Sequence, residues 1–397
     1  MRTIFHIDMN AYFASVAQQA NPFLRNKAIG IGGKPGTRSI IAAASQTAKK
    51  RGVKTAMSTR EALARCPDME IIAGDPHLYE HIAERFLGIF QRYTDCVELF
   101  SIDEAFLDVT AWADRWGGVR SLALRVKADI AKEIGAHITC SIGVAPNKLL
   151  AKLGSDMQKP DGFVWLTKKD LPVLFAFSEL TDFLGIAERT RRRLAAHHIH
   201  TLLDLHYAQL PILTSIFGSS TGLRLWLLGQ GEDPSPVIAT PPPSKSFGNS
   251  YTLPKDSADI DALRKTFFAL VEKATHRMRA ELFLASTISV TVRYADFTFH
   301  GAQGRLGEAA DDPLTLFHAA WTLLLPLLHR PCRLLGVHLG DLRVRGSQAS
   351  IWNEETQRKR VLAAIDAIHE RYGKNTIHAA ATTGVELKRH VSGFAPR

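Results

Sequence analysis

The chain has 397 residues, which is too long for one ordinary domain and predicts roughly two to four. A hydrophobic share of 46% and a charged share of 22% allow several buried cores and exclude disorder on a large scale. The net charge of +10, with a pI near 9.5, favours a polyanionic partner such as nucleic acid or an anionic membrane.

The cysteines and the first apolar stretch bear on the compartment. The four cysteines are widely spaced and form no CxxC pair, which argues against a zinc site or a disulfide framework and fits a reducing cytoplasm. Asp8 interrupts the first apolar stretch before a signal peptide can form. The apolar run 321–328 is too short to span a bilayer and contains Pro326. We therefore expect a cytoplasmic protein without a membrane segment.

In the first half of the chain, strand and helix signals alternate. Apolar runs predict strands at 3–8, 28–33, 40–45, 98–109 (a strand pair) and 137–145. Helical periodicity is typical of 10–20, 59–66, 77–93, 119–134 and 147–157. A dinucleotide-binding fingerprint is excluded, because Gly30 and Gly32 would need a third glycine where Pro35 stands.

The second half reads as a helical segment, a linker and a further domain. Residues 167–232 predict several short helices, and 233–246 contain five prolines, as expected of a linker. Beyond it the signals alternate as β-α-β-α-β, which suits a small α+β domain. The strands are expected at 251–253, 286–295 and 334–344, and the helices at 258–282 and 313–329, with a last helix at 358–373.

The stretch FSIDEAFLD, residues 100–108, places two adjacent acids, Asp103 and Glu104, in an apolar run. Neighbours on a straight strand point to opposite faces, so the two carboxylates can meet only if the chain turns at 101–104. Asp8, at the end of the first strand, is the natural third member. Three carboxylates without His or Cys suit a hard cation, Mg²⁺ before Zn²⁺. Spacing alone leaves open a hairpin whose acids pair with basic residues or face water.

Three blocks carry a family resemblance: HIDMNAYFASV at 6–16, FSIDEAFLDV at 100–109 and CSIGVAPNKLLAKLGSDMQKPDGF at 140–163. They resemble the signature blocks of Y-family DNA polymerases, most closely the bacterial DNA polymerase IV branch, and the similarity covers essentially the whole chain. The resemblance implies an α+β, multidomain right-hand polymerase whose palm carries a βαββαβ-type sheet. The implied parts are palm 1–18 and 75–166, fingers 19–74, helical thumb 167–232 with a helix-hairpin-helix, linker 233–246, α/β little finger 247–346 and tail 347–397.

The resemblance implies extension of a primer 3′-hydroxyl by deoxynucleoside triphosphates on template DNA, usually error-prone synthesis past lesions. Asp8 and Asp103 would ligate Mg²⁺ with the Met9 carbonyl, and Glu104 would hold the catalytic metal. Two Mg²⁺ ions per site are implied, with Mn²⁺ able to substitute. One ion would lower the pKa of the attacking hydroxyl, and the other would neutralise the triphosphate and the leaving pyrophosphate.

Nucleotide-binding residues follow from the same resemblance. Phe13 matches the steric gate that excludes a 2′-hydroxyl, with a core aromatic as the simpler alternative. Tyr12 beside it is grouped with this site, although packing is its more ordinary role. Lys159 matches a lysine that contacts the triphosphate. Lys148 and Lys152, spaced i, i+4, share a helical face and could reach one anion or the DNA backbone; solvated surface lysines are the alternative.

The fingers segment 45–58 departs from the family pattern. Gln46 replaces a tyrosine and Lys49 an arginine, both of which usually contact the triphosphate. Gln46 can still donate a hydrogen bond, whereas Lys49 keeps the charge without the bidentate fork. Ser58 replaces a proline, and Asn10 stands where many members have an aspartate that is not a metal ligand. These changes put nucleotide affinity in doubt more than the reaction.

DNA contacts are expected in both halves of the chain. Residues 179–205 resemble the thumb's helix-hairpin-helix, whose turn here, Gly185 to Ala187, has lost its second glycine; Arg191 lies beside it. The alternative is an amphipathic helical hairpin with a basic face. In the little finger, Arg293, Arg343 and Arg345 are candidate backbone contacts, and phosphate contacts of this sort make binding salt-dependent.

QASIW at 348–352 stands where relatives carry a sliding-clamp peptide. Gln348, Ile351 and Trp352 could fill a clamp pocket, but Ala349 replaces a leucine, and an ordinary connecting segment is the alternative. We expect a monomer. Two other hypotheses stay open: a non-catalytic DNA- and clamp-binding accessory protein, favoured by Gln46, Lys49 and Ala187, and a nucleotide cyclase with a similar palm.

Overall fold

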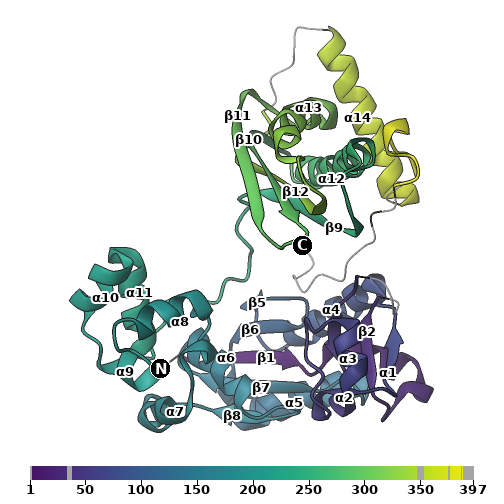
Figure 1. Ribbon diagram of the computed structural model, residues 1–397. Coiled ribbons are helices and arrows are strands. Elements are labelled where there is room, and N and C mark those ends of the chain that lie inside the picture. Colours follow the sequence, from purple (N-terminus) through teal and green to yellow (C-terminus); the bar gives the residue numbers. More distant parts are fainter. Residues whose placement is uncertain (1, 34–37, 347–352, 374–375, 386, 388–397) are drawn as a thin grey trace. The chain divides into compact units, whose positions relative to one another are not determined.

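The computed structural model describes residues 2–33, 38–346, 353–373, 376–385 and 387 (Figure 1). The chain divides into two compact units, and the division falls between Pro241 and Pro242, inside the proline-rich segment. Among the described residues, none of the helices combines the length and the apolar character that crossing a membrane requires.

The first unit is built on a five-stranded sheet of order β5-β6-β1-β7-β8. Its strands are β1 (Ile4–Met9), β5 (Val97–Leu99), β6 (Glu104–Asp108), β7 (Cys140–Ala145) and β8 (Phe163–Trp165). The central strand β1 is buried throughout and runs antiparallel to both β6 and β7. Because side chains alternate along a strand, Ile4, His6 and Asp8 share one face of β1.

Helices cover both faces of this sheet. Phe5, Ile7 and Met9 of β1 pack into a core with residues of three helices, α1 (Tyr12–Ala20), α4 (Pro76–Phe90) and α5 (Val119–Glu133). On the other face, Ile4 packs with α6 (Lys148–Met157). The approach of α6 is close, since a Cβ at Gly143 would lie 2.0 Å from the Ala151 carbonyl oxygen. A glycine is therefore required at this crossing.

Two smaller layers complete the first unit. A three-stranded sheet of order β3-β2-β4 packs with two short helices. Its elements are β2 (Ile29–Gly32), β3 (Ile41–Ala44), β4 (Glu70–Ile72), α2 (Gln46–Lys50) and α3 (Thr59–Arg65). Short helices follow β8, namely α7 (Leu171–Phe177), α8 (Glu188–Ala195), α9 (Leu202–Tyr207), α10 (Leu210–Phe217) and α11 (Ser219–Gly229). Their apolar faces join the core of α6.

The second unit is an antiparallel sheet of order β11-β10-β12-β9, covered on one face by two helices (Figure 1). Its elements are β9 (Phe247–Ser257), α12 (Ile260–Ala280), β10 (Phe283–Tyr294), β11 (Phe299–Ala310), α13 (Pro313–Leu324) and β12 (Cys332–Val344). A last helix, α14 (Asn353–Tyr372), is fastened to α12 because Arg279 forms two 2.8 Å hydrogen bonds with Asp366.

The sequence pattern predicted the order β-α-β-α-β for this unit, whereas the structure has one strand more, β11. β11 follows β10 directly as a hairpin partner, and its sequence FHGAQGRLGEAA hides the strand because three glycines interrupt the apolar alternation. The short strands β4 and β8 escaped prediction as well.

Candidate active site

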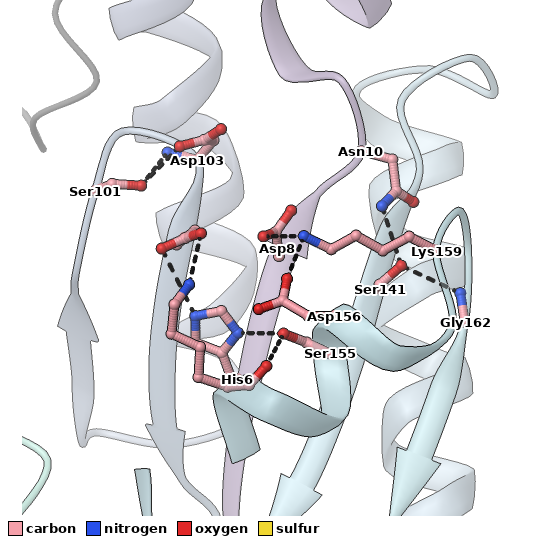
Figure 2. Close-up of polar contacts among 12 residues, drawn as sticks. His6, Asp8, Asn10, Ser101, Asp103, Ser141, Ser155, Asp156, Lys159 and Gly162 are labelled. Carbon is pink, nitrogen blue, oxygen red and sulfur yellow. Dashed lines mark hydrogen bonds and ion pairs between the residues drawn. The ribbon is translucent and has the colours of Figure 1, made fainter. Parts of the chain in front are cut away.

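The chain turns between β5 and β6 where the acid pair requires it. The Phe100 amide donates to the Glu104 carbonyl at 2.9 Å, which closes the turn, and the Met9 amide donates to the Asp103 carbonyl at 3.0 Å. In the register of β1 and β6, Asp8 lies directly opposite Glu104. The expected turn is thus present, and it brings the adjacent acids to the end of β1 (Figure 2).

Each of the three acids has a partner of its own. Lys159 donates to Asp8 at 2.5 Å, Lys152 donates to Glu104 at 2.9 Å, and the Ser101 hydroxyl donates to Asp103 at 2.6 Å. Lys159 also contacts Asp156 at 2.7 Å, so that it bridges two carboxylates (Figure 2).

Burial raises the pKa values of two of the three acids. Burial raises the pKa of Asp8 to about 6; Lys159 opposes this shift and Glu104 adds to it. Burial likewise raises the pKa of Asp103, with Asp8 contributing. Although burial alone would lower it, the pKa of Lys159 is raised by Asp8 and Asp156. A divalent cation would relieve this excess of negative charge, and the all-oxygen donor set is one that Mg²⁺ prefers.

The carboxylate oxygens of the three acids do not all lie as close together as the ligand atoms of a closed metal site. Within the part of the chain that the structure describes, the group whose ligand atoms all lie within 4.8 Å of one another is His276, Asp366 and His369 in the second unit. There Asp366 is already paired with Arg279. Asp8, Asp103 and Glu104 do not meet this criterion as a group of three, and each carboxylate has a separate partner.

His6 is a residue of this site that the sequence analysis missed. It is fully buried, on the same face of β1 as Asp8. The Ser155 hydroxyl lies 2.7 Å from His6 Nδ1 and 2.7 Å from the Lys152 carbonyl oxygen. His6 Nε2 lies 3.9 Å from Glu104 Oε2 and has no hydrogen-bond partner among the described residues.

The imidazole of His6 is neutral. Burial, followed by Lys152 and Lys159, lowers its pKa well below the usual value. The period-two alternation of TIFHID could have placed His6 beside Asp8, but no sequence signal gives its contacts with Ser155 and Glu104.

The loop that carries Lys159 is held by Asn10, just after β1, and by Ser141 of β7. Asn10 donates to the Ser141 hydroxyl at 3.0 Å (Figure 2). It also accepts from the Asp161 amide at 2.7 Å. A Cβ at Gly162 would lie 1.7 Å from the Gln158 carbonyl oxygen, so this position requires glycine. Asn10 therefore serves as a donor and an acceptor at once, which an aspartate could not do.

Lys148 and Lys152 share a face of α6, as expected, but they reach different anions. Lys148 lies 2.9 Å from both carboxylate oxygens of Glu98 on β5, whereas Lys152 pairs with Glu104. The Ile238 amide also donates to Glu98, at 2.8 Å. Lys148 thus neutralises an acid outside the group formed by Asp8, Asp103 and Glu104.

The aromatic residues after β1 are buried on α1. The Phe13 ring is 7% exposed, and its centroid lies 4.4 Å from that of Tyr79. The Tyr12 hydroxyl donates to the Tyr79 carbonyl at 2.6 Å, and burial, followed by Asp103, raises the pKa of Tyr12. Tyr12 is therefore fixed by packing, and its hydroxyl is already used.

In the fingers segment, Gln46 and Lys49 lie on α2, which Ser45 caps. Partial burial, followed by Lys159, lowers the pKa of Lys49, while Asp8 and Asp103 oppose that shift. Lys49 therefore lies within electrostatic range of the acids and of Lys159, as a residue acting on the same ligand would.

The other predicted contact residues are dispersed. Gly185 has a φ of +96°, and exposed Ala187 begins α8 without a side-chain cap. Arg191 is bound to Glu188 on its own helix at 2.7 Å, and Arg343 is exposed on β12. Gln348, Ile351 and Trp352 lie outside the described residues.

Comparisons with known proteins agree with this fold. Residues 7–156 match the impB/mucB/samB family, and residues 244–351 match the C-terminal domain of that family. The chain is 34% identical to DNA polymerase IV of Pelotomaculum thermopropionicum, covering 98% of this chain and 97% of that protein. It is also 34% identical to DNA polymerase IV of Moorella thermoacetica, covering 96% of each chain. A solved Y-family DNA polymerase chimera superposes with a TM-score of 0.76 at 26% identity, covering 86% of this chain and all of that one.

The sheet with its acids, the helical segment and the C-terminal domain define a template-dependent nucleotidyltransferase, and the chain belongs to the Y family of DNA polymerases. It is a DNA-directed DNA polymerase of translesion synthesis, whose substrates are primer–template DNA and deoxynucleoside triphosphates and which depends on a divalent metal. The relatives that match it over nearly their whole length are bacterial DNA polymerase IV proteins.

Proposed function

We propose that this polymerase works by a two-Mg²⁺ mechanism in which Asp8, Asp103 and Glu104 hold the ions, with Mn²⁺ able to substitute. The observation that carries the proposal is the pairing of β1 with β6, which sets Asp8 opposite Glu104. The raised pKa values of Asp8 and Asp103 support it, because they mark acids that gain from a bound cation. Met9 would add its carbonyl as a further oxygen ligand.

When bound, the ions would activate the primer hydroxyl and neutralise the triphosphate. The chain's own residues prepare the site for this. Lys152 pairs with Glu104 at 2.9 Å, and the buried ring of His6 lies beside the same carboxylate, with Nε2 at 3.9 Å from Oε2. Lys159 pairs with Asp8 and Asp156 and, on binding of a nucleotide, would exchange these carboxylates for phosphate oxygens.

Primer extension with the Asp103→Ala variant tests this proposal. Asp103 contacts Ser101 and, among the described residues, forms no ion pair with a lysine, so its removal changes the proposed metal ligands without freeing a buried cation. We expect extension in Mg²⁺ to fall by at least about 10³-fold, since stabilisation of transition-state charge by metal ions supplies several kcal/mol. Undiminished extension would refute the mechanism. It would also revive the alternative of a protein that binds DNA without catalysis.

We further propose that Phe13 is the steric gate against ribonucleotides and that Tyr12 fixes it by packing. Support comes from the burial of Phe13 between Tyr12 and Tyr79, which leaves the ring no room to yield to a 2′-hydroxyl. Gln46, Lys49 and Lys159 would bind the triphosphate. The electrostatic influence of Lys159 on Lys49 supports a shared anion.

DNA contacts are proposed at the backbone of Gly185 and Ala187, with Arg191, and in the second unit at Arg293 and Arg343. The exposure of Gly185 and Ala187 just before α8 supports the first group, because backbone amides at a helix N-terminus can contact phosphate. Replacing Arg343 by Gln should weaken binding of duplex DNA uniformly across sequences. It should also reduce the slope of log affinity against log salt concentration by about one.

For the segment 348–352 we propose binding to a sliding clamp through Gln348, Ile351 and Trp352. Deleting these five residues should abolish binding of purified clamp to the immobilised protein, and intact binding would remove this proposal. We also propose a monomer that acts in the cytoplasm. The four free cysteines support the cytoplasmic location, since thiols persist in a reducing compartment.

A further inference from the structure

Aromatic and basic side chains gather at the end of the β10–β11 hairpin in the second unit. The Arg293 guanidinium lies 4.5 Å from the ring centroid of Phe297 and 4.7 Å from that of Phe299. Arg333, at the start of β12, lies 4.4 Å from the centroid of Phe297. We call Arg293, Phe297, Phe299 and Arg333 the arginine–aromatic tip.

The rings of this tip are unusually exposed for phenylalanines. Phe297 is 52% exposed and Phe299 is 58% exposed, so about half of each ring remains available to a ligand. Packing of the hairpin does not require such exposure, because the core of this unit is filled from the opposite face of the sheet by residues such as Val290, Val292 and Tyr294.

The backbone at Phe297 is strained as well. Its φ is +68°, a left-handed conformation in which a bulky residue is a rare outlier. Glycine would adopt this conformation without cost, so an aromatic ring is kept at the turn despite the strain. Strain of this kind at an exposed position suggests a binding role for the side chain.

The tip also offers positive charge that is not fully compensated. Arg333 has Asp256 at 4.0 Å, the limit of an ion pair. Arg293 donates to the Phe297 carbonyl at 3.4 Å but makes no ion pair with a carboxylate among the described residues. An exposed π surface next to guanidinium groups that are not fully compensated is complementary to an unpaired base and its phosphate.

We propose that the arginine–aromatic tip binds single-stranded DNA, with unpaired bases stacked on Phe297 and Phe299 and the adjoining phosphates contacted by Arg293 and Arg333. Duplex DNA presents its base faces only to neighbouring bases, so stacking selects a single-stranded segment. The site rests on the protein's DNA substrate and not on the proposed metal chemistry. It can therefore be measured in chelator, without nucleotides.

The test compares two oligonucleotides of equal length, oligothymidine and its abasic counterpart, by fluorescence anisotropy with the full chain. The variant is Phe297→Gly/Phe299→Ala, which removes both rings while the glycine suits the positive φ. We expect oligothymidine to bind about tenfold more weakly to the variant, and the abasic strand to bind equally to both proteins, because stacking contributes roughly that factor. Phe23→Ala, which removes an 84% exposed ring from the first unit, should change neither affinity.

Two results would overturn the proposal. Unchanged affinity of the variant for oligothymidine would show that the rings do not contact bases. Equal weakening on both strands would show that the rings only position the arginines. A separate variant, Arg293→Gln, should reduce the slope of log affinity against log salt by roughly 0.7 on both strands. An unchanged slope would contradict the phosphate contact.

Discussion

Asp8 and Glu104 face each other across β1 and β6, and a different lysine neutralises each of them. Lys159 comes from the loop after α6 and Lys152 from α6 itself. The two acids therefore lie close together in a half-buried site without collapsing onto one shared cation. Lys152 and Lys159 therefore each neutralise one acid of the site and are not merely surface charges.

Replacing Lys152 by Met should alter the metal dependence of the polymerase. The ammonium of Lys152 competes with a cation for Glu104, so its loss should lower the Mg²⁺ concentration that half-saturates primer extension, by about three- to tenfold. Lys148→Met is the matched control, because Lys148 has a similar exposure and an equally short contact, but with Glu98. An equal shift in both variants, or none in Lys152→Met, would contradict this role.

Replacing Asp8 by Asn should stabilise the fold, and more so at higher pH. The pKa of Asp8 is raised from 3.8 to about 6, so the folded protein binds this proton more tightly than the unfolded chain. The ionised group therefore lowers stability by up to about 3 kcal/mol above pH 6, and this cost disappears as the pH falls towards 4.

The check is urea unfolding in chelator, where the variant's advantage should be larger at about pH 8 than at about pH 5. Asp95→Asn, at an exposed position, serves as the control. An advantage that does not depend on pH would show that the burial of Asp8 is not its source.

Much of this site could be predicted from residues 3–8 and 100–108. The apolar run of β1 and the acid pair required a turn, and the turn is present. The partners of the acids could not be predicted, because Lys152 and Lys159 become neighbours only when α6 crosses the sheet at Gly143. The same holds for His6, whose contact with Ser155 joins segments that are 149 positions apart.

Prediction also failed where strands lack apolar alternation. In β11, glycines and polar residues break the alternation of apolar and polar side chains that marks a strand. The strands β4 and β8 are only three residues long. Pairing with neighbouring strands, rather than propensity, makes these segments strands.

Replacing Gly162 by Ala should weaken nucleotide binding more than it slows chemistry. The added Cβ would meet the Gln158 carbonyl oxygen, so the loop that carries Lys159 would have to move. We expect KM for deoxynucleotides to rise about tenfold while kcat changes less than threefold, because the acids on β1 and β6 keep their places. A loss confined to kcat would contradict the assignment of Lys159 to the triphosphate.

Replacing Phe13 by Val should relax sugar discrimination. The ring is held by Tyr12 and Tyr79, so truncation leaves space that a 2′-hydroxyl can occupy. Incorporation of ribonucleotides relative to deoxynucleotides should rise by at least about tenfold, measured as the ratio of kcat/KM. Tyr12→Phe, which removes only a hydroxyl already bonded to the Tyr79 carbonyl, should change this ratio much less.

The central claim is that Glu104 serves the chemical step and not the binding of substrates. Single-turnover primer extension by Glu104→Gln tests it most directly, because glutamine keeps the shape of the side chain and can still accept from Lys152. Affinities for DNA and nucleotide should remain within about threefold, while the rate of phosphodiester formation falls by at least about 10³-fold. A variant that extends primers at the wild-type rate would contradict the claim.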